Sequence, residues 1–226
     1  MTSSRPAART LVALACAAAL GTTCLATAPG SSAADTRTTT TLASPGAGVV
    51  VFGGTVDVDV RVDSPSGLAP TAGTSTLLAL EAGSTEWVEV DTSTSPGADF
   101  LEVRPWRNTT YKVAYSGSSD TGNGDSWAAS ESEPFTIGVK RRIVHPATGF
   151  DLSGRVTPRF GRRVVVVRAS RDKATGYAVV KRVRTDKRGR YSYVLPKRRG
   201  TWYWILRVPG DASYRGNAFA YQTNVF

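Results

Sequence analysis

The chain contains 226 residues, of which 41% are hydrophobic and 20% are charged, and its formal net charge at neutral pH is +10. This length allows one or two domains with hydrophobic cores of their own, and the basic balance favours acidic partners. With two cysteines, Cys16 and Cys24, and one histidine, His145, the composition excludes a cysteine-rich scaffold and a metal site of paired histidines.

The N-terminal residues have the pattern of an export signal. Residues 11–20 form a short apolar run (LVALACAAAL) after two basic residues, Arg5 and Arg9. Small residues follow at 32–34 (SAA), which suits cleavage by a signal peptidase. We therefore predict a signal peptide over residues 1–34 and a secreted, extracellular product that can associate with the cell wall.

Two other uses of this N-terminal segment have weaker support. Its ten apolar residues fall short of the roughly 20 that span a bilayer, so no transmembrane segment is expected in the mature chain. Neither Cys16 nor Cys24 follows the residues of a typical lipid-attachment motif, which argues against a lipid anchor. Because both cysteines precede the predicted cleavage, the mature chain has no thiol, disulfide or cysteine ligand. Residues 35–41, which are rich in threonine, are expected to form a disordered lead-in.

Strand patterns dominate the rest of the chain. Valines alternate with charged residues over 56–63, which predicts a strand with one apolar face. The same alternation occurs at residues 202–208, whereas residues 164–167 are continuously apolar, as in a strand covered on both faces. Residues 186–189 (DKRG) have the composition of a hairpin turn, and we find no convincing amphipathic helix. These patterns predict an all-β protein.

One stretch of the sequence recurs 91 positions later. A shift of 91 positions aligns Val103 with Val194. The same shift aligns aromatic residues with aromatic residues: Phe100 with Tyr191, and Tyr111 with Trp202. A glycine, an aspartate and an aromatic residue then follow each copy: Gly117, Asp125 and Trp127, and Gly210, Asp211 and Tyr214. This spacing is too long for a solenoid repeat and close to the size of one β-sandwich, about 100 residues. We therefore predict two tandem immunoglobulin-like β-sandwich domains after the signal peptide.

The predicted domain boundaries follow from this repeat. They place one sandwich at residues 42–138 and the second at residues 147–226, joined by a linker at residues 139–146. Because Pro146 disfavours a helix at the residue before it, the linker is expected to be extended. Close packing of the two domains is the alternative.

Four stretches carry a resemblance to known proteins. Residues 201–214 (TWYWILRVPGDASY) are similar to the penultimate strand and following turn of immunoglobulin-like modules, and residues 185–193 (TDKRGRYSY) to their mid-domain hairpin. In the first domain, residues 111–117 and 127–132 occupy the same places, with a longer loop between them. The chain thus resembles secreted actinobacterial proteins with tandem immunoglobulin-like or fibronectin-like β-sandwich repeats. Because members of that family act as spacers, adhesive modules and enzyme accessories, a structural or adhesive spacer without a ligand remains open.

Charge divides at the domain boundary. Residues 35–138 contain five basic and fourteen acidic side chains (−9), and residues 139–226 contain twenty-one basic and four acidic ones (+17). Neutralising a polyanion releases its condensed counterions, which favours binding, so we expect an anionic cell-wall or matrix polymer as the partner. The candidate residues are Arg162, Arg163, Lys181, Arg182, Arg184, Lys187, Arg188, Arg190, Lys197, Arg198 and Arg199. Alternatives are a solvated face that protects strand edges and self-association of the acidic domain with the basic domain.

Aromatic residues allow a different partner. Trp202, Tyr203 and Trp204 are consecutive, so strand alternation turns Tyr203 away from the face of the two tryptophans. An exposed tyrosine can stack on a sugar ring, which makes Tyr203 a candidate for a carbohydrate-binding module. The alternative is that these aromatic side chains pack in the hydrophobic core of the domain.

Catalytic and metal-binding groups are scarce. His145 is the only histidine, and it lies in the linker, so we expect no enzymatic activity and no cofactor. Two pairs of carboxylates suit solvated strand residues better than a glycosidase: Glu86 with Glu89, and Glu131 with Glu133. Residues 120–126 (DTGNGDS) resemble a calcium loop but have glycines where ligands would be expected, so no metal site is predicted.

Overall fold

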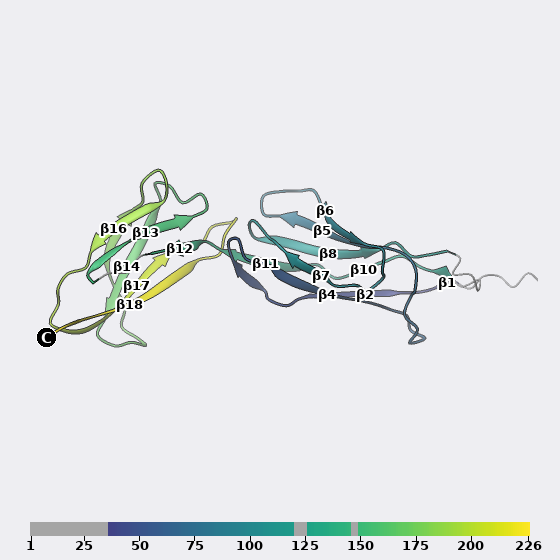
Figure 1. The fold of residues 1–226 in the computed structure, drawn as a ribbon, viewed down its shortest axis with the longest axis horizontal. Helices are drawn as coiled ribbons and strands as arrows, with labels where there is room; N and C mark the ends of the chain where they lie inside the picture. The colour runs from purple at the N-terminus through teal and green to yellow at the C-terminus, as the bar shows by residue number, and fades with distance from the viewer. Residues whose placement is uncertain (1–35, 120–125, 146–148) are drawn as a thin grey trace, which may run out of the picture. The chain divides into compact units, whose positions relative to one another are not determined.

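The computed structural model describes residues 36–119, 126–145 and 149–226, and these residues form two immunoglobulin-like, fibronectin-like β-sandwiches (Figure 1). The predicted signal peptide lies outside the described residues, and so do Pro146 and most of the possible calcium loop. The fold class predicted from the sequence is confirmed for the part of the chain that is described.

The first sandwich consists of two facing sheets. The first sheet has the order β2 (Thr40–Pro45), β4 (Val56–Asp63) and β7 (Phe100–Val103). The second has the order β3 (Val49–Val51), β11 (Phe135–Lys140), β8 (Thr109–Tyr115), β5 (Ser75–Glu81) and β6 (Val88–Ser93). Three short strands complete this half: β1 (Thr36–Arg37), β9 (Ser126–Trp127) and β10 (Ser130–Glu131).

The second sandwich repeats this plan. Its three-stranded sheet has the order β12 (Arg142–Val144), β13 (Asp151–Thr157) and β16 (Arg190–Val194). Its four-stranded sheet has the order β15 (Ala178–Arg184), β14 (Val164–Ser170), β17 (Gly200–Val208) and β18 (Asn217–Val225). The two sandwiches thus share one strand order. In the smaller sheet, β12, β13 and β16 take the places of β2, β4 and β7. In the larger sheet, β15, β14, β17 and β18 take the places of β6, β5, β8 and β11. The recurrence seen in the sequence therefore coincides with a recurrence of strand order.

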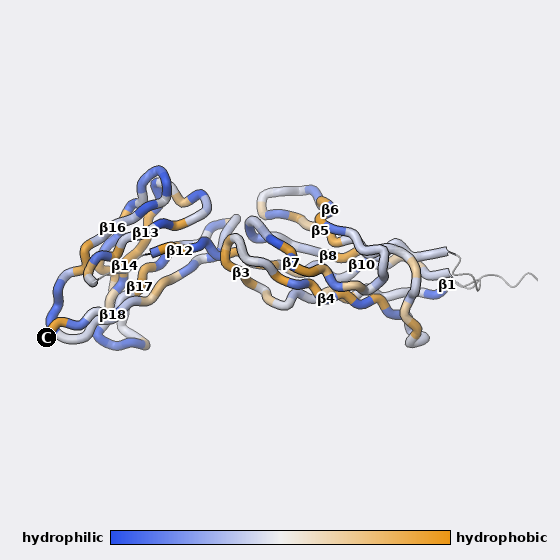
Figure 2. The backbone as a smooth tube through the Cα atoms, in the orientation of Figure 1, coloured by the Kyte–Doolittle hydropathy of each residue, from blue (hydrophilic) through white to orange (hydrophobic). Residues whose placement is uncertain are grey.

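Each sandwich has its own hydrophobic core. In β4 the four valines are buried while the intervening charged residues are mostly exposed, as the alternation predicted. The core of the second sandwich includes Phe160, Trp204 and Leu206, and it shares no residue with the core around β4. Hydrophobic residues lie along the strands of both halves, and hydrophilic segments occupy many of the connections (Figure 2). Alternating apolar residues thus determine both cores.

Two strand-level expectations need correction. In β14 only Val165 and Val167 are buried among the first four residues, so this strand is covered on one face rather than both. The DKRG segment is a turn, but it joins β15 and β16, which belong to different sheets and do not form a hairpin. The carboxylate of Asp186 accepts the N–H groups of Arg188 and Arg190, which stabilises the turn locally and explains its hairpin-like composition.

Strands include much of the expected lead-in and linker. Within the lead-in, β1 pairs with β9, and the Thr41 hydroxyl lies 2.7 Å from that of Ser130, so these residues join the first sandwich. Within the linker, Lys140 ends β11 and Arg142 begins β12, so Arg141 alone separates the two strands. The threonine-rich lead-in was expected to be disordered, but strand pairing satisfies its backbone groups, and residues 142–144 of the linker, expected to be extended, form the strand β12. The predicted boundaries of the two domains remain predictions.

Candidate functional site

Four arginines share the outer face of the four-stranded sheet in the second sandwich. Cross-strand partners point to the same face of a sheet. The register pairs Arg182 and Arg207 with Val166, pairs Arg168 with Val179 and Ile205, and pairs Arg184 with Val164. Their neighbours Val165 and Val167 are buried on the opposite, core-facing side. We call this set the arginine face: Arg168, Arg182, Arg184 and Arg207.

A shallow hollow lies in the arginine face. Its volume is about 360 Å³, and its lining residues are Val166, Arg168, Val179, Arg182, Arg207 and Pro209. Valine side chains provide the apolar floor, on which the aliphatic stems of arginine can lie. Arg182 and Arg207 are exposed, whereas Arg168 is half-buried and its Nη2 donates to the Tyr177 carbonyl. The hollow therefore combines apolar contact with several hydrogen-bond donors.

Carboxylates of the second sandwich are engaged elsewhere. Asp186 and Asp172 accept backbone N–H groups in their own turns. The N–H of Arg190, assisted by that of Arg188, lowers the pKa of Asp186 below its ordinary value. Asp211 pairs with arginines outside this face, and Asp151 begins β13 in the other sheet. The described residues that line the hollow include no carboxylate, so its positive charge has no local acidic partner there.

Sequence reasoning found half of the arginine face. Arg182 and Arg184 belong to a basic run and were predicted. Arg168 and Arg207 were missed because each is a single charge inside an apolar strand, in VVVVRAS and GTWYWILRV. Their period-two position relative to buried residues such as Val167 was the sequence signal that could have identified them.

The remaining predicted residues lie apart from this face. Lys181 pairs with Val167, so it extends toward the core-facing side at the rim of the sheet. Arg162 and Arg163 precede β14, and Arg163 is ion-paired with Asp211. Two others, Lys187 and Arg188, belong to the turn between β15 and β16, and Arg190 begins β16 in the other sheet. The predicted set is therefore not one contiguous patch.

A second basic group lies beside Trp202, and one of its members packs on the indole ring. Lys197, Arg198 and Arg199 lie in the connection between β16 and β17. The guanidinium carbon of Arg198 is 4.4 Å from the Trp202 ring centroid, and that of Arg171 is 5.1 Å away. Two cations packed on one indole stabilise this end of the sandwich by cation–π attraction.

Tyr203 lies on the same face of the sheet as the arginines. It pairs with Ser170 and Gln222, two positions along from the pairing of Ile205 with Arg168, so it extends to the same side. Trp204 is buried on the other face, where its indole Nε1 donates to the Thr223 hydroxyl at 2.8 Å. The predicted alternation is therefore confirmed, while carbohydrate binding by Tyr203 stays a prediction.

Arg141 belongs to a buried cluster rather than to the basic surface. Its side chain is enclosed by the rings of Tyr214 and Phe160, whose centroids lie 4.2 and 5.1 Å from the guanidinium carbon. Its Nη2 donates to the Asp211 carboxylate at 2.7 Å, and its Nε donates to the Pro158 carbonyl. Burial would raise the pKa of Asp211, but the hydrogen bond and charge of Arg141 hold that pKa below its ordinary value. The Asp211 and Tyr214 noticed in the sequence therefore serve a structural ion pair.

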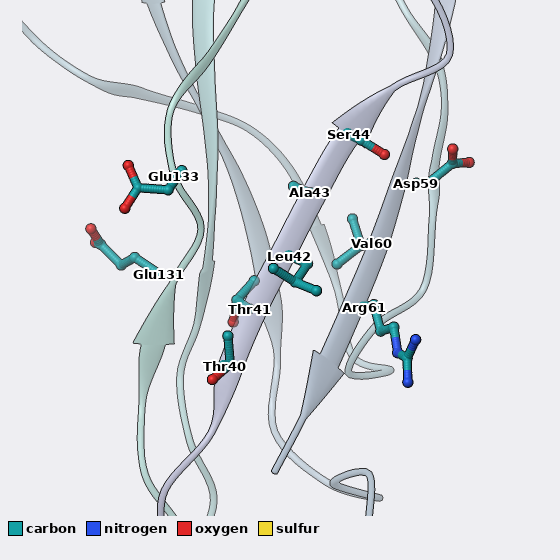
Figure 3. Close-up of a pocket in the computed structure, with 10 residues that line it drawn as sticks. All are labelled: Thr40, Thr41, Leu42, Ala43, Ser44, Asp59, Val60, Arg61, Glu131 and Glu133. Carbon is teal, nitrogen blue, oxygen red and sulfur yellow. The ribbon is translucent and has the colours of Figure 1, made fainter. Parts of the chain in front are cut away.

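A hollow in the first sandwich runs along β2 (Figure 3). It has a volume of about 720 Å³, and Leu42 in its wall is 55% exposed. Glu131 and Glu133 lie to one side of Leu42, and Arg61 lies to the other (Figure 3). The residues lining it include no histidine or cysteine, so they supply no ready nucleophile or general base of those types.

The described ranges place the one histidine against an aromatic ring and contain no metal-type cluster. The ring of His145 stacks on Phe219, with centroids 3.4 Å apart. Within residues 36–119, 126–145 and 149–226, we find no group of three or more histidine, cysteine, aspartate or glutamate side chains placed to hold a metal ion. The same residues contain no helix with the length and apolar character needed to cross a membrane.

Comparisons with known proteins identify no family. No protein-family model matches the chain, and no curated protein matches it. Among solved structures, it is similar to the human OSCAR ligand-binding domain (18% identity, 80% of this chain and 98% of that chain, TM-score 0.26). It is also similar to a segment of two fibronectin type III domains from chicken tenascin (15% identity, 80% and 97%, TM-score 0.38). The FN1–FN3 domains of chicken CNTN1 are a third (11% identity, 84% and 68%, TM-score 0.30).

Proposed function

We propose that this chain is an exported, non-enzymatic attachment protein whose second sandwich binds an anionic polymer of the cell envelope or matrix. The observation that supports this proposal is the arginine face, where four guanidinium groups lie on one side of a sheet. Export itself and the resemblance to secreted actinobacterial proteins remain expectations from the sequence.

The geometry suits a flexible polymer rather than a small ligand. Guanidinium groups form paired hydrogen bonds with phosphate or carboxylate, so several of them can bind successive charged groups. Each neutralised charge releases condensed counterions, and this gain is independent of base or sugar identity. Tyr203, on the same face, adds an aromatic surface for the repeating units of such a polymer.

Neutralising part of the arginine face is expected to weaken retention. In the triple variant R182Q, R184Q and R207Q, the slope of log K against log salt should become less steep by about 2. Retention near about 100 mM salt should fall roughly tenfold or more, because three counterion-releasing contacts are lost. The measurement is co-sedimentation of the full chain with purified cell walls across a salt series.

A matched variant separates the arginine face from net charge. K187Q, K197Q and R199Q remove the same number of charges from exposed loops of the same sandwich. If both triple variants lose retention equally, the face assignment is wrong and total charge governs binding. If the unaltered chain fails to bind even at low salt, the alternative of an immunoglobulin-like structural or adhesive spacer without a ligand is favoured.

A further inference from the structure

The larger sheet of the first sandwich has β6 at one edge, and the larger sheet of the second sandwich has β15 at one edge. β6 pairs with β5 and, among the described residues, with no other strand, and β15 likewise pairs with β14 alone. Nearly all residues of β6 are exposed, as are most of β15. An open edge presents unpaired N–H and C=O groups, to which another strand can add.

The two edges have opposite charges. β6 contains Glu89 and Asp91 and no basic residue. β15 contains Lys181, Arg182 and Arg184 and no acidic residue. Like charges on facing strands are destabilising, so neither edge is suited to pair with its own equivalent. Opposite charges on facing strands are stabilising, so the two edges suit each other.

The register assigns each β6 residue to one side of its sheet. Asp91 pairs with Leu77 and Val88 pairs with Ala79, and both partners are buried, so these two residues extend to the core-facing side. Glu89, which pairs with Leu78, extends to the outer side. A bulge between these pairs leaves Val90 without an opposing residue.

β15 has the same kind of pattern. Lys181 and Val183 pair with the buried Val167 and Val165, so they extend to the core-facing side. Arg182 extends to the outer side. A bulge here leaves Val180 without an opposing residue, and its side chain packs against the core. Val179, which pairs with Arg168, extends to the outer side.

We propose that β6 of one copy adds antiparallel to β15 of a second copy. When Val90 and Val180 both stay unpaired as bulges, the sides agree throughout, because Asp91 then faces Lys181, Glu89 faces Arg182, and Val88 faces Val183. Thr92 faces Val179 in the same register. The pairing gives two opposite-charge contacts, one on each side of the combined sheet, flanked by an apolar contact. Charged, bulged edges usually prevent pairing, and here the charges prevent only the pairing of identical edges.

This contact joins different surfaces of the two copies. Each copy contains one acidic edge and one basic edge, so it can engage two neighbours at once. Such heterologous contacts extend into rings or open assemblies rather than stopping at a symmetric dimer. For a polymer-binding protein, the consequence is several second sandwiches in one assembly, and hence stronger attachment through multivalency.

Charge reversal at either edge tests the pairing. We expect the unaltered chain to associate with increasing concentration in sedimentation velocity at low ionic strength, about 20 mM, where screening is weak. The acidic-edge variant E89K with D91K and the basic-edge variant K181E with R182E should each associate about tenfold or more weakly. An equimolar mixture of the two variants should associate again, because each now supplies the edge that the other requires.

A matched control and three outcomes decide the proposal. D59K with E133K makes the same change in charge on exposed residues of the first sandwich away from β6, and it should associate like the unaltered chain. The proposal is overturned if an edge variant associates normally, if the mixture fails to recover, or if the unaltered chain stays monomeric at all concentrations. Circular dichroism of each variant establishes that the sandwiches are folded. Polymer retention by E89K with D91K should persist, since the arginine face is intact, but it should be weaker than that of the unaltered chain because the multivalent assembly is lost.

Discussion

Replacing Asp211 with asparagine is expected to destabilise the second sandwich by about 3 kcal/mol. Arg141 is almost fully buried, with 1% of its surface exposed, and its charge is compensated by the Asp211 carboxylate. Asparagine can still accept the N–H groups of Ser213 and Tyr214 through Oδ1, so the turn itself is retained. The loss of stability therefore reports the cost of an uncompensated buried charge. The measurement is the free energy of unfolding, determined by urea denaturation.

A double-mutant cycle and a pH series test this explanation. R141M combined with D211N should be less destabilised than D211N alone, because the buried charge is removed. The folded-state pKa of Asp211 lies below its unfolded value of about 3.9, so the pair's stabilisation is present above that pH. It is lost as pH falls through the folded-state pKa, and the difference between the unaltered chain and D211N should shrink there. A D211N protein as stable as the unaltered chain at neutral pH would falsify the assignment.

Replacing Trp204 with alanine is expected to cost about 3–5 kcal/mol in the second sandwich. The side chain is 1% exposed and packs in the core that contains Phe160 and Leu206. The change also removes the indole donor of the buried Thr223 hydroxyl. Hydrogen exchange should therefore show loss of protection in β14 and β17, while β4 and β8 of the other core keep theirs.

Tyr203 provides the matched control for Trp204. It is the adjacent aromatic residue in the same strand, but it lies on the outer face and is only half-buried. Y203A should consequently cost much less than W204A, about 1 kcal/mol or less. Equal loss of protection in both sandwiches after W204A would contradict the description of two separate cores.

Local patterns explain why the architecture could be predicted from sequence. The valines of β4 and the aromatic alternation at Tyr203 follow a period of two, which depends only on neighbours in the chain. Burial of Arg141 could not be predicted in this way, because its partner Asp211 is 70 residues away in the sequence. Nothing in the run of three basic residues at 140–142 distinguishes its buried central member from its neighbours.

The candidate site likewise has features that the sequence predicts and features that it does not. Runs of basic residues indicated where charge is dense, but Arg163 is ion-paired and Arg198 packs on Trp202. The arginine face depends on isolated residues such as Arg168 and Arg207, which meet only when β14 and β17 pair. The density of basic residues along the chain is therefore a poor guide to the density of positive charge on a surface that several strands form.

The single-residue connection between β11 and β12 also affects how the protein can be degraded. Lys140, Arg141 and Arg142 form a sequence that trypsin-like proteases prefer, yet the carbonyl of Lys140 accepts the N–H of Phe52, and that of Arg141 accepts the Asn217 amide. Proteases need an exposed segment that can adapt to their active site. The exposed bend at residues 171–174 is a better substrate, and cleavage there cuts the second sandwich internally. Limited digestion is therefore expected to cut the second sandwich internally before any cleavage at residues 140–142 releases that sandwich as an intact fragment.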